Sequence, residues 1–293
     1  MLRQCACALA AAIATALAAV PTSAHGGEPA LDKSQFNLFH PTPRDLMREL
    51  STDRPDKTES PYTVDAGHFQ IESDLVNFSY DRYNGDPTDT TNRSWSFANT
   101  NLKAGLLNNV DLQLVVPTFN YVRSEDRGAN LVDENSGFGD LITRLKINLW
   151  GNDGGKTAFA VMPFIKFPTA QDHLGNGAFE GGLILPLAVK LPAGWSLGVM
   201  TEFDFNEDGS GDGYHAEFIN TITVSHALVG ELSGYAEFFS SVSSEDDSDW
   251  IGTVDLGLTY GLTDYIQLDA GVNIGVTRAA DDINPFVGVS WRF

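Results

Sequence analysis

The stretch Asn284-Pro285-Phe286-Val287-Gly288-Val289-Ser290-Trp291-Arg292-Phe293 reads as a strand embedded in a membrane. Side chains of a strand alternate between its two faces. One face of this stretch is apolar and carries two aromatic residues near its end: Pro285, Val287, Val289, Trp291 and Phe293. An apolar face with aromatic residues at its rim is typical of a strand that meets lipid at a membrane interface. The stretch therefore predicts that the rest of the chain forms strands of one closed sheet.

The same alternation recurs along the chain and gives twelve candidate strands, the quoted stretch included. Apolar and polar residues alternate over 67–80, 94–106, 109–122, 138–150, 156–168, 180–191, 195–206, 214–226, 231–242, 250–260, 265–276 and 284–293. A soluble β-sandwich has the same alternation, so periodicity alone does not decide. The connections after odd-numbered segments are long and polar, among them 123–137, and those after even-numbered segments are short, which is typical of outer-membrane barrels. The sequence therefore predicts an all-β fold, a transmembrane antiparallel up-and-down β-barrel of about twelve strands over residues 67–293.

Residues 1–24 read as an export signal. Arg3 is followed by an apolar run to Val20 and then by small residues up to Ala24, as at a cleavage site. The two cysteines of the chain, Cys5 and Cys7, fall within this signal, so we expect a mature protein without disulfides. Beyond the signal, no apolar run reaches the roughly 18 residues that a membrane helix needs.

The charge of the chain excludes one class of partner. Lys and Arg number 18 and Asp and Glu number 39, for a formal net charge of −21. Binding of nucleic acid requires a basic surface that neutralises phosphates, so we expect no nucleic-acid partner.

Residues 25–66 are polar and rich in proline, and they predict a short N-terminal segment in the periplasm. A short helix is expected over Arg44–Leu50. Prolines bracket the charged stretch Thr52–Pro61 and prevent a long helix or strand there. Together with Tyr62–Glu72, this stretch resembles the opening signature of the bacterial outer-membrane family named for the MetA pathway of phenol degradation. The resemblance implies an outer-membrane β-barrel that transports small solutes, and it brings no catalytic residues.

Charged side chains on the polar faces are expected to line the lumen and to pair across it, because an unpaired charge in a confined space is costly. The tentative lumen residues are Arg54, Lys57, Asp140, Arg144, Glu180, Glu202, Asp204, Glu217, Glu237, Asp255 and Asp269. We expect Thr52–Pro61 at the periplasmic mouth, with Arg54 paired to lumen carboxylates. The alternative is that these residues form a flexible tether.

Aromatic residues on the apolar faces predict where the barrel meets the membrane interface. Trp195, Tyr260, Trp291 and Phe293 are expected to anchor the barrel near its short turns. Trp150 conflicts with this pattern, because alternation places it on the polar face. The alternation also slips in the first three strands, for which we expect β-bulges.

No catalytic residue, cofactor or metal site is expected, and the chain is not predicted to be an enzyme. Ser225 and His226 are adjacent and face opposite sides of a strand, so they cannot act as nucleophile and base. The loops Asp208–Asp212 and Glu245–Asp249 contain oxygen ligands, but neither has the spacing of a calcium-binding loop. Their acidity is expected to keep the loops solvated and to join the divalent-ion layer of an anionic lipid surface.

The sequence thus predicts a channel in the outer membrane of a Gram-negative cell, which passes small solutes by passive or facilitated diffusion. The family resemblance implies that these solutes are apolar or aromatic molecules. A structural or adhesive barrel that transports nothing and a secreted soluble β protein remain open. The expected partners are outer-membrane lipid and lipopolysaccharide, a small-molecule solute, and the barrel-assembly machinery, because the terminal Phe293 resembles an insertion signal.

Overall fold

The structure, a computed structural model, describes residues 32–82, 89–171 and 173–293. The export signal predicted over residues 1–24 lies outside the described residues. Lys33–Phe293 form one compact unit, and the fold below is that of this unit. No helix among the described residues is long and apolar enough to cross a membrane.

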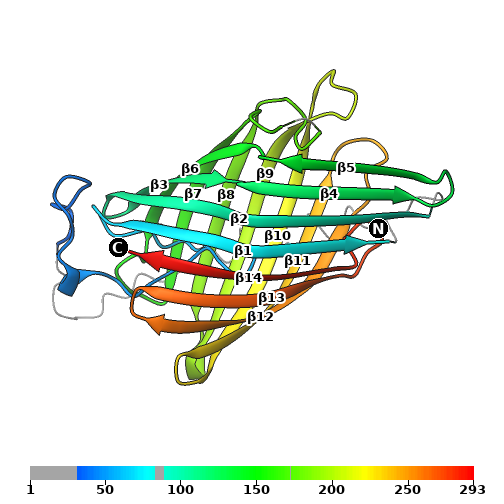
Figure 1. The fold of residues 1–293 in the computed structure, drawn as a ribbon. Helices are drawn as coiled ribbons and strands as arrows, with labels where there is room; N and C mark the ends of the chain where they lie inside the picture. Colours follow the sequence, from blue (N-terminus) through cyan, green and yellow to red (C-terminus); the bar gives the residue numbers. More distant parts are fainter. Residues whose placement is uncertain (1–31, 83–88, 172) are drawn as a thin grey trace. The chain divides into compact units, whose positions relative to one another are not determined.

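Fourteen strand segments of the described residues form one antiparallel sheet (Figure 1). They are β1 (Phe69–Asp81), β2 (Thr90–Leu107), β3 (Val110–Val116), β4 (Phe119–Asp126), β5 (Leu131–Gly137), β6 (Leu141–Trp150), β7 (Thr157–Phe167), β8 (Glu180–Lys190), β9 (Trp195–Glu207), β10 (Tyr214–Val229), β11 (Leu232–Ser243), β12 (Ile251–Thr263), β13 (Ile266–Gly275) and β14 (Ile283–Arg292). β1 pairs with β2 on one side and with β14 on the other, so the sheet closes into a barrel.

Two strands of the barrel are each interrupted once: β3 and β4 are the two parts of one strand, and β5 and β6 are the two parts of its neighbour. Pro117 lies between β3 and β4 and has no backbone N–H to donate to a neighbour. β2 continues past the break, pairing with β3 from Thr100 onward and with β4 before Ala98. On the other side, β3 pairs with β6 and β4 pairs with β5. Counted this way, the described residues form a barrel of twelve strands, which confirms the sequence prediction.

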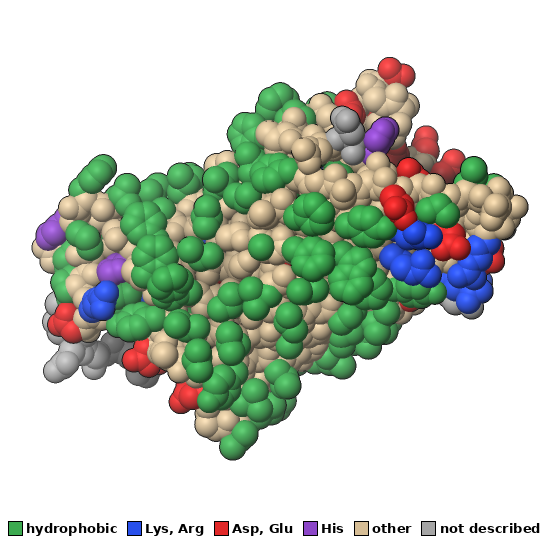
Figure 2. Space-filling model, in the orientation of Figure 1, with side chains coloured by type: hydrophobic (Ala, Val, Ile, Leu, Met, Phe, Trp, Pro, Cys, Tyr) green, Lys and Arg blue, Asp and Glu red, His purple; other side chains and the backbone are tan. Residues whose placement is uncertain are grey.

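The outer surface of the barrel is apolar and its interior is polar. Along β12, the exposed Val254, Leu256, Leu258 and Tyr260 alternate with residues such as Asp255, which is fully buried. Figure 2 shows hydrophobic side chains over the outside of the strands and charged side chains gathered toward the ends. This arrangement reverses that of a soluble sandwich and is that of an outer-membrane barrel.

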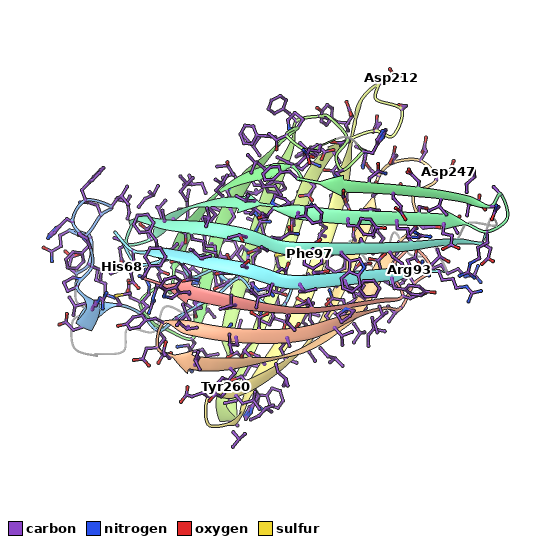
Figure 3. All side chains as sticks on the ribbon, in the orientation of Figure 1. His68, Arg93, Phe97, Asp212, Asp247 and Tyr260 are labelled. Atoms are coloured by element: carbon purple, nitrogen blue, oxygen red, sulfur yellow. The ribbon has the colours of Figure 1, made fainter. Side chains whose placement is uncertain are left out.

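The two ends of the barrel differ in their connections. Asp212 and Asp247 lie in long loops at one end, and His68 and Tyr260 lie at the other end with the short turns (Figure 3). The predicted loop 123–137 is wrong, because β4 and β5 extend through most of it and pair from Asn120 with Gly137 to Asp126 with Leu131. Arg123 and Glu134 face each other there and form an ion pair, which favours a cross-strand pair over a solvated loop.

β-Bulges explain where the alternation of the sequence slips. One extra residue, Leu75, lies in β1 between its pairings with β14, as expected for the first strand. A second bulge in β6 inserts Leu149 between two pairings with β7. It turns Trp150 outward, where its ring stacks on Phe159 with centroids 4.9 Å apart. The lumen position that alternation gave Trp150 is therefore wrong, because a bulge shifts every later side chain to the other face.

The helix predicted over Arg44–Leu50 is reduced to the single 3-10 turn η1 (Arg44–Leu46). Met47 is already extended, and the backbone N–H of Arg48 donates to Asp65 Oδ2 at 3.1 Å. This contact draws the chain away from a helical path. A second 3-10 turn, η2 (Pro192–Gly194), forms the short connection between β8 and β9.

Candidate functional site

Residues 51–65, called the lumen segment below, run inside the barrel. Several of their backbone N–H groups donate to carboxylates of the wall. Asp53 N donates to Glu72, and Lys57 N and Thr58 N both donate to Glu237 at 2.8 Å. Because buried N–H groups need acceptors and Pro55 and Pro61 prevent regular structure, the wall carboxylates take the place of a partner strand. Part of the acidity of the lumen therefore serves to hold this segment.

Asp53 connects the lumen segment to the strands at the start of the barrel. Its Oδ1 accepts from Lys146 Nζ and its Oδ2 from Lys103 Nζ, and Lys103 also pairs with Glu72. All four side chains are at most 5% exposed. Burial alone would raise the pKa of Asp53, but the charges of the two lysines outweigh it and hold the pKa far below its usual value. The cluster is thus a network of ionised groups in which each charge has a partner.

Arg54 joins two neighbouring regions of the wall. Its Nη1 donates to Asp74 Oδ1 at 2.5 Å, and its Nη2 and Nε donate to the two oxygens of Asp269 at 2.7 and 3.2 Å. Its guanidinium carbon lies 5.7 Å from the centre of the Phe286 ring. The expected pairing of Arg54 with lumen carboxylates is thus present, and the bidentate geometry with Asp269 is the one that guanidinium groups favour.

Lys57 lies at the far tip of the lumen segment. Its Nζ is 2.8 Å from Thr253 Oγ1 and 3.2 Å from Asp255 Oδ2, and it lies 4.2 Å from the centre of the Phe239 ring. Above it, toward the long loops, is a cavity of about 200 Å³. Its lining includes Lys57, Phe239, Ile251, Thr253, Asn273 and Asn284. The cavity combines an aromatic wall with an ammonium group and two amides.

Thr58 and Glu59 hold the segment against the opposite wall. The Thr58 hydroxyl lies 2.6 Å from that of Thr221, and Glu59 Oε1 accepts from Arg144 Nη1 at 2.6 Å. Arg144 belongs to β6, whereas Asp269, which holds Arg54, belongs to β13. β6 and β13 are separated by six strands in one direction around the barrel and by four in the other. The lumen segment therefore bridges opposite sides of the lumen, and lies deeper than the mouth position expected from the sequence.

The base of the lumen segment is held at the short-turn end. Asp65 accepts from Arg292 Nη1 at 3.3 Å and pairs with Arg48 Nη2 at 3.4 Å. Arg292 Nη2 also donates to the backbone oxygen of Arg48 at 2.8 Å. Arg292, the last residue of β14, thus contacts Asp65 at the end of the lumen segment and Arg48 just before its start.

Two carboxyl groups of the lumen segment have raised pKa values. Burial, with the charges of Asp53 and Asp255 nearby, raises the pKa of Asp56 to about 7. Burial and then the charge of Asp53 raise the pKa of Glu59 to about 7, although the charge of Arg144 opposes this. Both groups therefore change their charge close to neutral pH, inside the lumen.

The sequence of the chain matches a known protein family. The family described as "Putative MetA-pathway of phenol degradation" matches residues 52–293. The chain belongs to this family. The match begins at Thr52, so the family's common region includes nearly all of the lumen segment as well as the barrel. A comparison with curated protein sequences found no match.

Solved structures similar to this family member are outer-membrane barrels. The crystal structure of the COG4313 outer membrane channel from Pseudomonas putida F1 has 16% sequence identity and a TM-score of 0.58, and the similarity covers 83% of this chain and 100% of that chain. A structure of the NanC porin has 11% identity and a TM-score of 0.47, over 76% of this chain and 98% of that one. At 16% identity, the first similarity shows the fold, an outer-membrane β-barrel.

The structure brings six of the predicted lumen residues together around the lumen segment: Arg54, Lys57, Arg144, Glu237, Asp255 and Asp269. Whether any of them contacts a solute stays a prediction.

Of the other predicted lumen residues, Asp140, Glu180 and Glu217 make their contacts elsewhere, whereas the charges of Glu202 and Asp204 interact with that of Arg144, the partner of Glu59. Asp140 accepts backbone N–H groups of the β7–β8 loop, and Glu180 pairs with Lys166 of β7. Glu217 accepts from Asn206 and Ser241 on the neighbouring strands. Glu202 and Asp204 share the lumen face of β9. Asp140 and Glu180 thus support connections at the long-loop end.

The predicted membrane anchors all point out of the barrel. Trp195, Tyr260, Trp291 and Phe293 are between 46% and 48% exposed. Phe293 lies against Trp291 and against Phe69 of β1, with ring centroids 5.1 and 5.9 Å apart. Their contact with lipid stays a prediction.

Asp53 was not among the predicted lumen residues, yet it pairs with two charged side chains, as many as Arg54 does. Its neighbours Glu72, Lys103 and Lys146 lie buried on the lumen faces of β1, β2 and β6. The position of Asp53 beside Arg54 in the signature was the available signal. What the sequence could not give is the path of a segment without regular structure, and that path decides which carboxylate meets which lysine.

Proposed function

We propose that the protein is an outer-membrane channel that passes small solutes by passive or facilitated diffusion, with the lumen segment narrowing the path. The observation that carries the proposal is the place of Lys57, whose ammonium group borders the cavity of about 200 Å³ inside the barrel. A solute that enters from the long-loop end would meet this group first. The lumen segment is then part of the path and not only a tether.

The cavity favours small aromatic solutes that carry a hydroxyl or carboxylate group. Phe239 and Ile251 offer an apolar wall, and Lys57 and Asn273 offer N–H donors for an oxygen atom. Both amide hydrogens of Asn284 are donated to Asn77 and to the backbone oxygen of Phe78. A cavity of roughly 150 Å³ is large enough for benzene, so this one suits a single substituted ring. The phenol degradation named in the family's description supports the same class of solute.

The location and partners of the channel complete the proposal. Residues 1–24 direct export, the short-turn end faces the periplasm, and the acidic long loops face outward beside lipopolysaccharide. The terminal strand is recognised by the barrel-assembly machinery. No catalytic step and no cofactor form part of this function.

One alternative function has a specific observation in its favour. The lumen segment is held by ion pairs on opposite walls, through Arg54 and Glu59. A segment that never moves would make the barrel a structural or adhesive protein that displays acidic loops and transports nothing.

Swelling of liposomes that contain the purified protein separates these functions. We expect liposomes in isotonic benzoate or phenol to swell faster than in a sugar, and faster than protein-free liposomes. Equal rates with and without protein for every solute would overturn the channel proposal and favour the structural barrel. Heat-modifiable migration on gels is the control for a folded barrel.

A further inference from the structure

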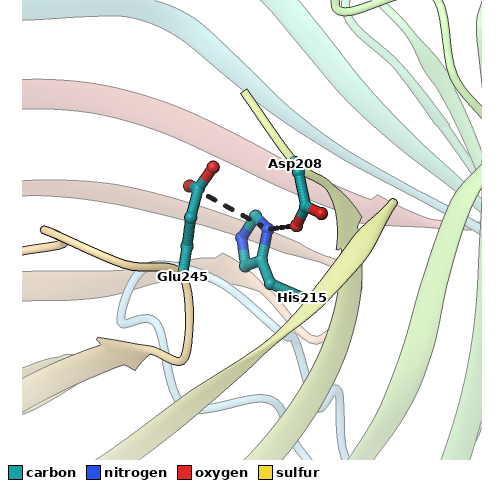
Figure 4. A group of neighbouring side chains, drawn as sticks. All are labelled: Asp208, His215 and Glu245. Atoms are coloured by element: carbon teal, nitrogen blue, oxygen red, sulfur yellow. Dashed lines mark hydrogen bonds and ion pairs between the residues drawn. The ribbon is translucent and has the colours of Figure 1, made fainter. Parts of the chain in front are cut away.

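Three side chains with metal-binding atoms meet at the long-loop end of the barrel (Figure 4). Asp208 follows β9, His215 is the second residue of β10, and Glu245 follows β11. They therefore come from two different loops and one strand. Neither the stretch around Asp208 nor that around Glu245 has the spacing of a metal-binding loop by itself.

The distances between these ligand atoms match those around a small tetrahedral cation. His215 Nδ1 lies 3.1 Å from Asp208 Oδ1 and 3.9 Å from Glu245 Oε2, and all three ligand atoms lie within 4.8 Å of one another. Zinc binds nitrogen and carboxylate oxygen at about 2.0 to 2.2 Å, which places tetrahedral ligand atoms about 3.4 Å apart. Only small movements of the side chains would let one ion contact all three atoms.

Hydrogen bonds outside the cluster already hold its members in place. The backbone N–H of Gly209 donates to the other oxygen of Glu245 at 2.7 Å, which ties the two loops together. Asp208 N donates to Gly213 O at 2.9 Å and closes the β9–β10 loop. His215 is also fixed by its strand, and its side chain is only 12% exposed. Supported ligands of this kind lose little freedom when an ion binds.

We propose that Asp208, His215 and Glu245 form a binding site for a divalent transition metal ion of the zinc class. The imidazole nitrogen favours Zn²⁺, Ni²⁺ or Cu²⁺ over Ca²⁺ and Mg²⁺, which prefer oxygen ligands alone. Three protein ligands leave a fourth position for water or another donor. The ion would take the place of the hydrogen bond between His215 Nδ1 and Asp208 Oδ1.

Such an ion would fasten two loops at the outer mouth of the lumen. His215 lies on the same face of β10 as Thr221, whose hydroxyl contacts Thr58 of the lumen segment. The bound ion would therefore restrict the motion of these two loops at the long-loop end of the lumen. This consequence rests on the proposed channel function, whereas metal binding itself does not.

Titration calorimetry of the intact protein in detergent, first stripped with a chelator, tests the site. We expect one saturable Zn²⁺ site per chain and at least tenfold weaker binding of Ca²⁺. His215→Ala and, separately, Glu245→Gln should each weaken Zn²⁺ binding at least tenfold. His226→Ala is the matched control, because His226 lies at the other end of β10, and it should bind Zn²⁺ as the unaltered protein does.

Two results would overturn the site: no saturable Zn²⁺ binding to the unaltered protein, or binding that survives both ligand substitutions. Should His215→Ala fail to give a heat-modifiable barrel, Glu245→Gln carries the same expectation on its own, since Glu245 lies in a loop outside the strands. The readout is independent of transport. If the liposome experiment rejected the channel proposal, the calorimetric evidence for the metal site would still hold. If calorimetry rejected the metal site, the channel proposal would be unaffected.

Discussion

The guanidinium group of Arg54 occupies the space that a side chain on Gly288 would fill. A Cβ atom on Gly288 would lie 2.1 Å from Arg54 Nη2. Gly288 pairs with Asp74 on one side and with Asp269 on the other, and these are the two carboxylates that bind Arg54. Asp74 of β1, Gly288 of β14 and Asp269 of β13 lie in one row and thus form a binding site for the Arg54 side chain.

Gly288→Ala should therefore release Arg54 from the wall. The added methyl group leaves the two carboxylates in place but excludes the guanidinium, so we expect higher single-channel conductance and a lower unfolding temperature. The matched control is Gly261→Ala, because the nearest atom to a Cβ there is 3.4 Å away, an ordinary contact. Equal conductance of Gly288→Ala and the control would contradict the role given to this row.

Asp53→Asn should destabilise the protein strongly, because Lys146 loses its ion-pair partner while fully buried. Breaking one side of a buried pair costs on the order of 3–5 kcal/mol. Urea unfolding in detergent measures the loss, with Asp247→Asn in an exposed loop as control. Adding Lys146→Met to Asp53→Asn should recover about 1 kcal/mol or more, since the unpaired charge is removed. A single variant within about 0.5 kcal/mol of the unaltered protein would argue against the network.

Lys57→Met should change the charge selectivity of the channel. The substitution removes the positive charge at the cavity and leaves Asp255, whose side chain is fully buried, without its cation. We expect reversal potentials in a salt gradient to shift toward cation selectivity, and entry of benzoate to fall more than entry of phenol. Lys156→Met, in a short turn at the opposite end, should change neither. An unchanged reversal potential would show that Lys57 does not line the path of ions through the channel.

Conductance should rise as the pH rises from 5 to 8. The pKa of Asp56 is about 7 in the docked segment against its usual 3.8, so docking is strongest below about pH 4 and weakens as Asp56 ionises on the way to pH 7. Glu59 acts in the same direction over the same range, because the cost of burying its charge exceeds the gain from its ion pair with Arg144. Asp53 does not oppose this above pH 5, because its lowered pKa keeps it ionised.

Planar-bilayer recordings at each pH check this expectation. Asp56→Asn should flatten the rise, because its side chain no longer titrates, whereas Asp212→Asn in an exposed loop should leave the rise intact. A conductance that falls with pH would reverse the sign of the argument and reject it.

The barrel could be predicted from the sequence because every strand in a membrane barrel alternates apolar side chains toward lipid with polar side chains toward the lumen. Residues such as Leu256 and Asp255 alternate with period two, and the long and short connections give the direction of each strand. Where a single residue is inserted, as at Leu149, the rule fails locally and Trp150 is placed on the wrong face. The register of β4 and β5 was likewise hidden, because charged residues such as Arg123 and Glu134 suit a loop as well as an exposed hairpin.

The candidate site was less predictable because its contacts join distant positions. Arg54 and Asp269 are 215 residues apart in the chain, and Asp208 and Glu245 belong to separate loops. The excess of acidic residues on the lumen faces predicted that Arg54 pairs with lumen carboxylates, but it did not predict which ones. The site around Gly288 is an example. Asp74, Gly288 and Asp269 are neighbours across three strands, and only the strand register shows this.

The most direct test of the account is a reversible bond between the lumen segment and the wall. Thr58 and Thr221 have hydroxyl oxygens 2.6 Å apart, and the chain's own cysteines are Cys5 and Cys7, both in the predicted export signal. In Thr58→Cys/Thr221→Cys, we expect a disulfide to form under oxidation and single-channel conductance to increase when a reductant breaks it. If the two cysteines do not join, or if conductance is the same before and after reduction, the lumen segment does not control the channel.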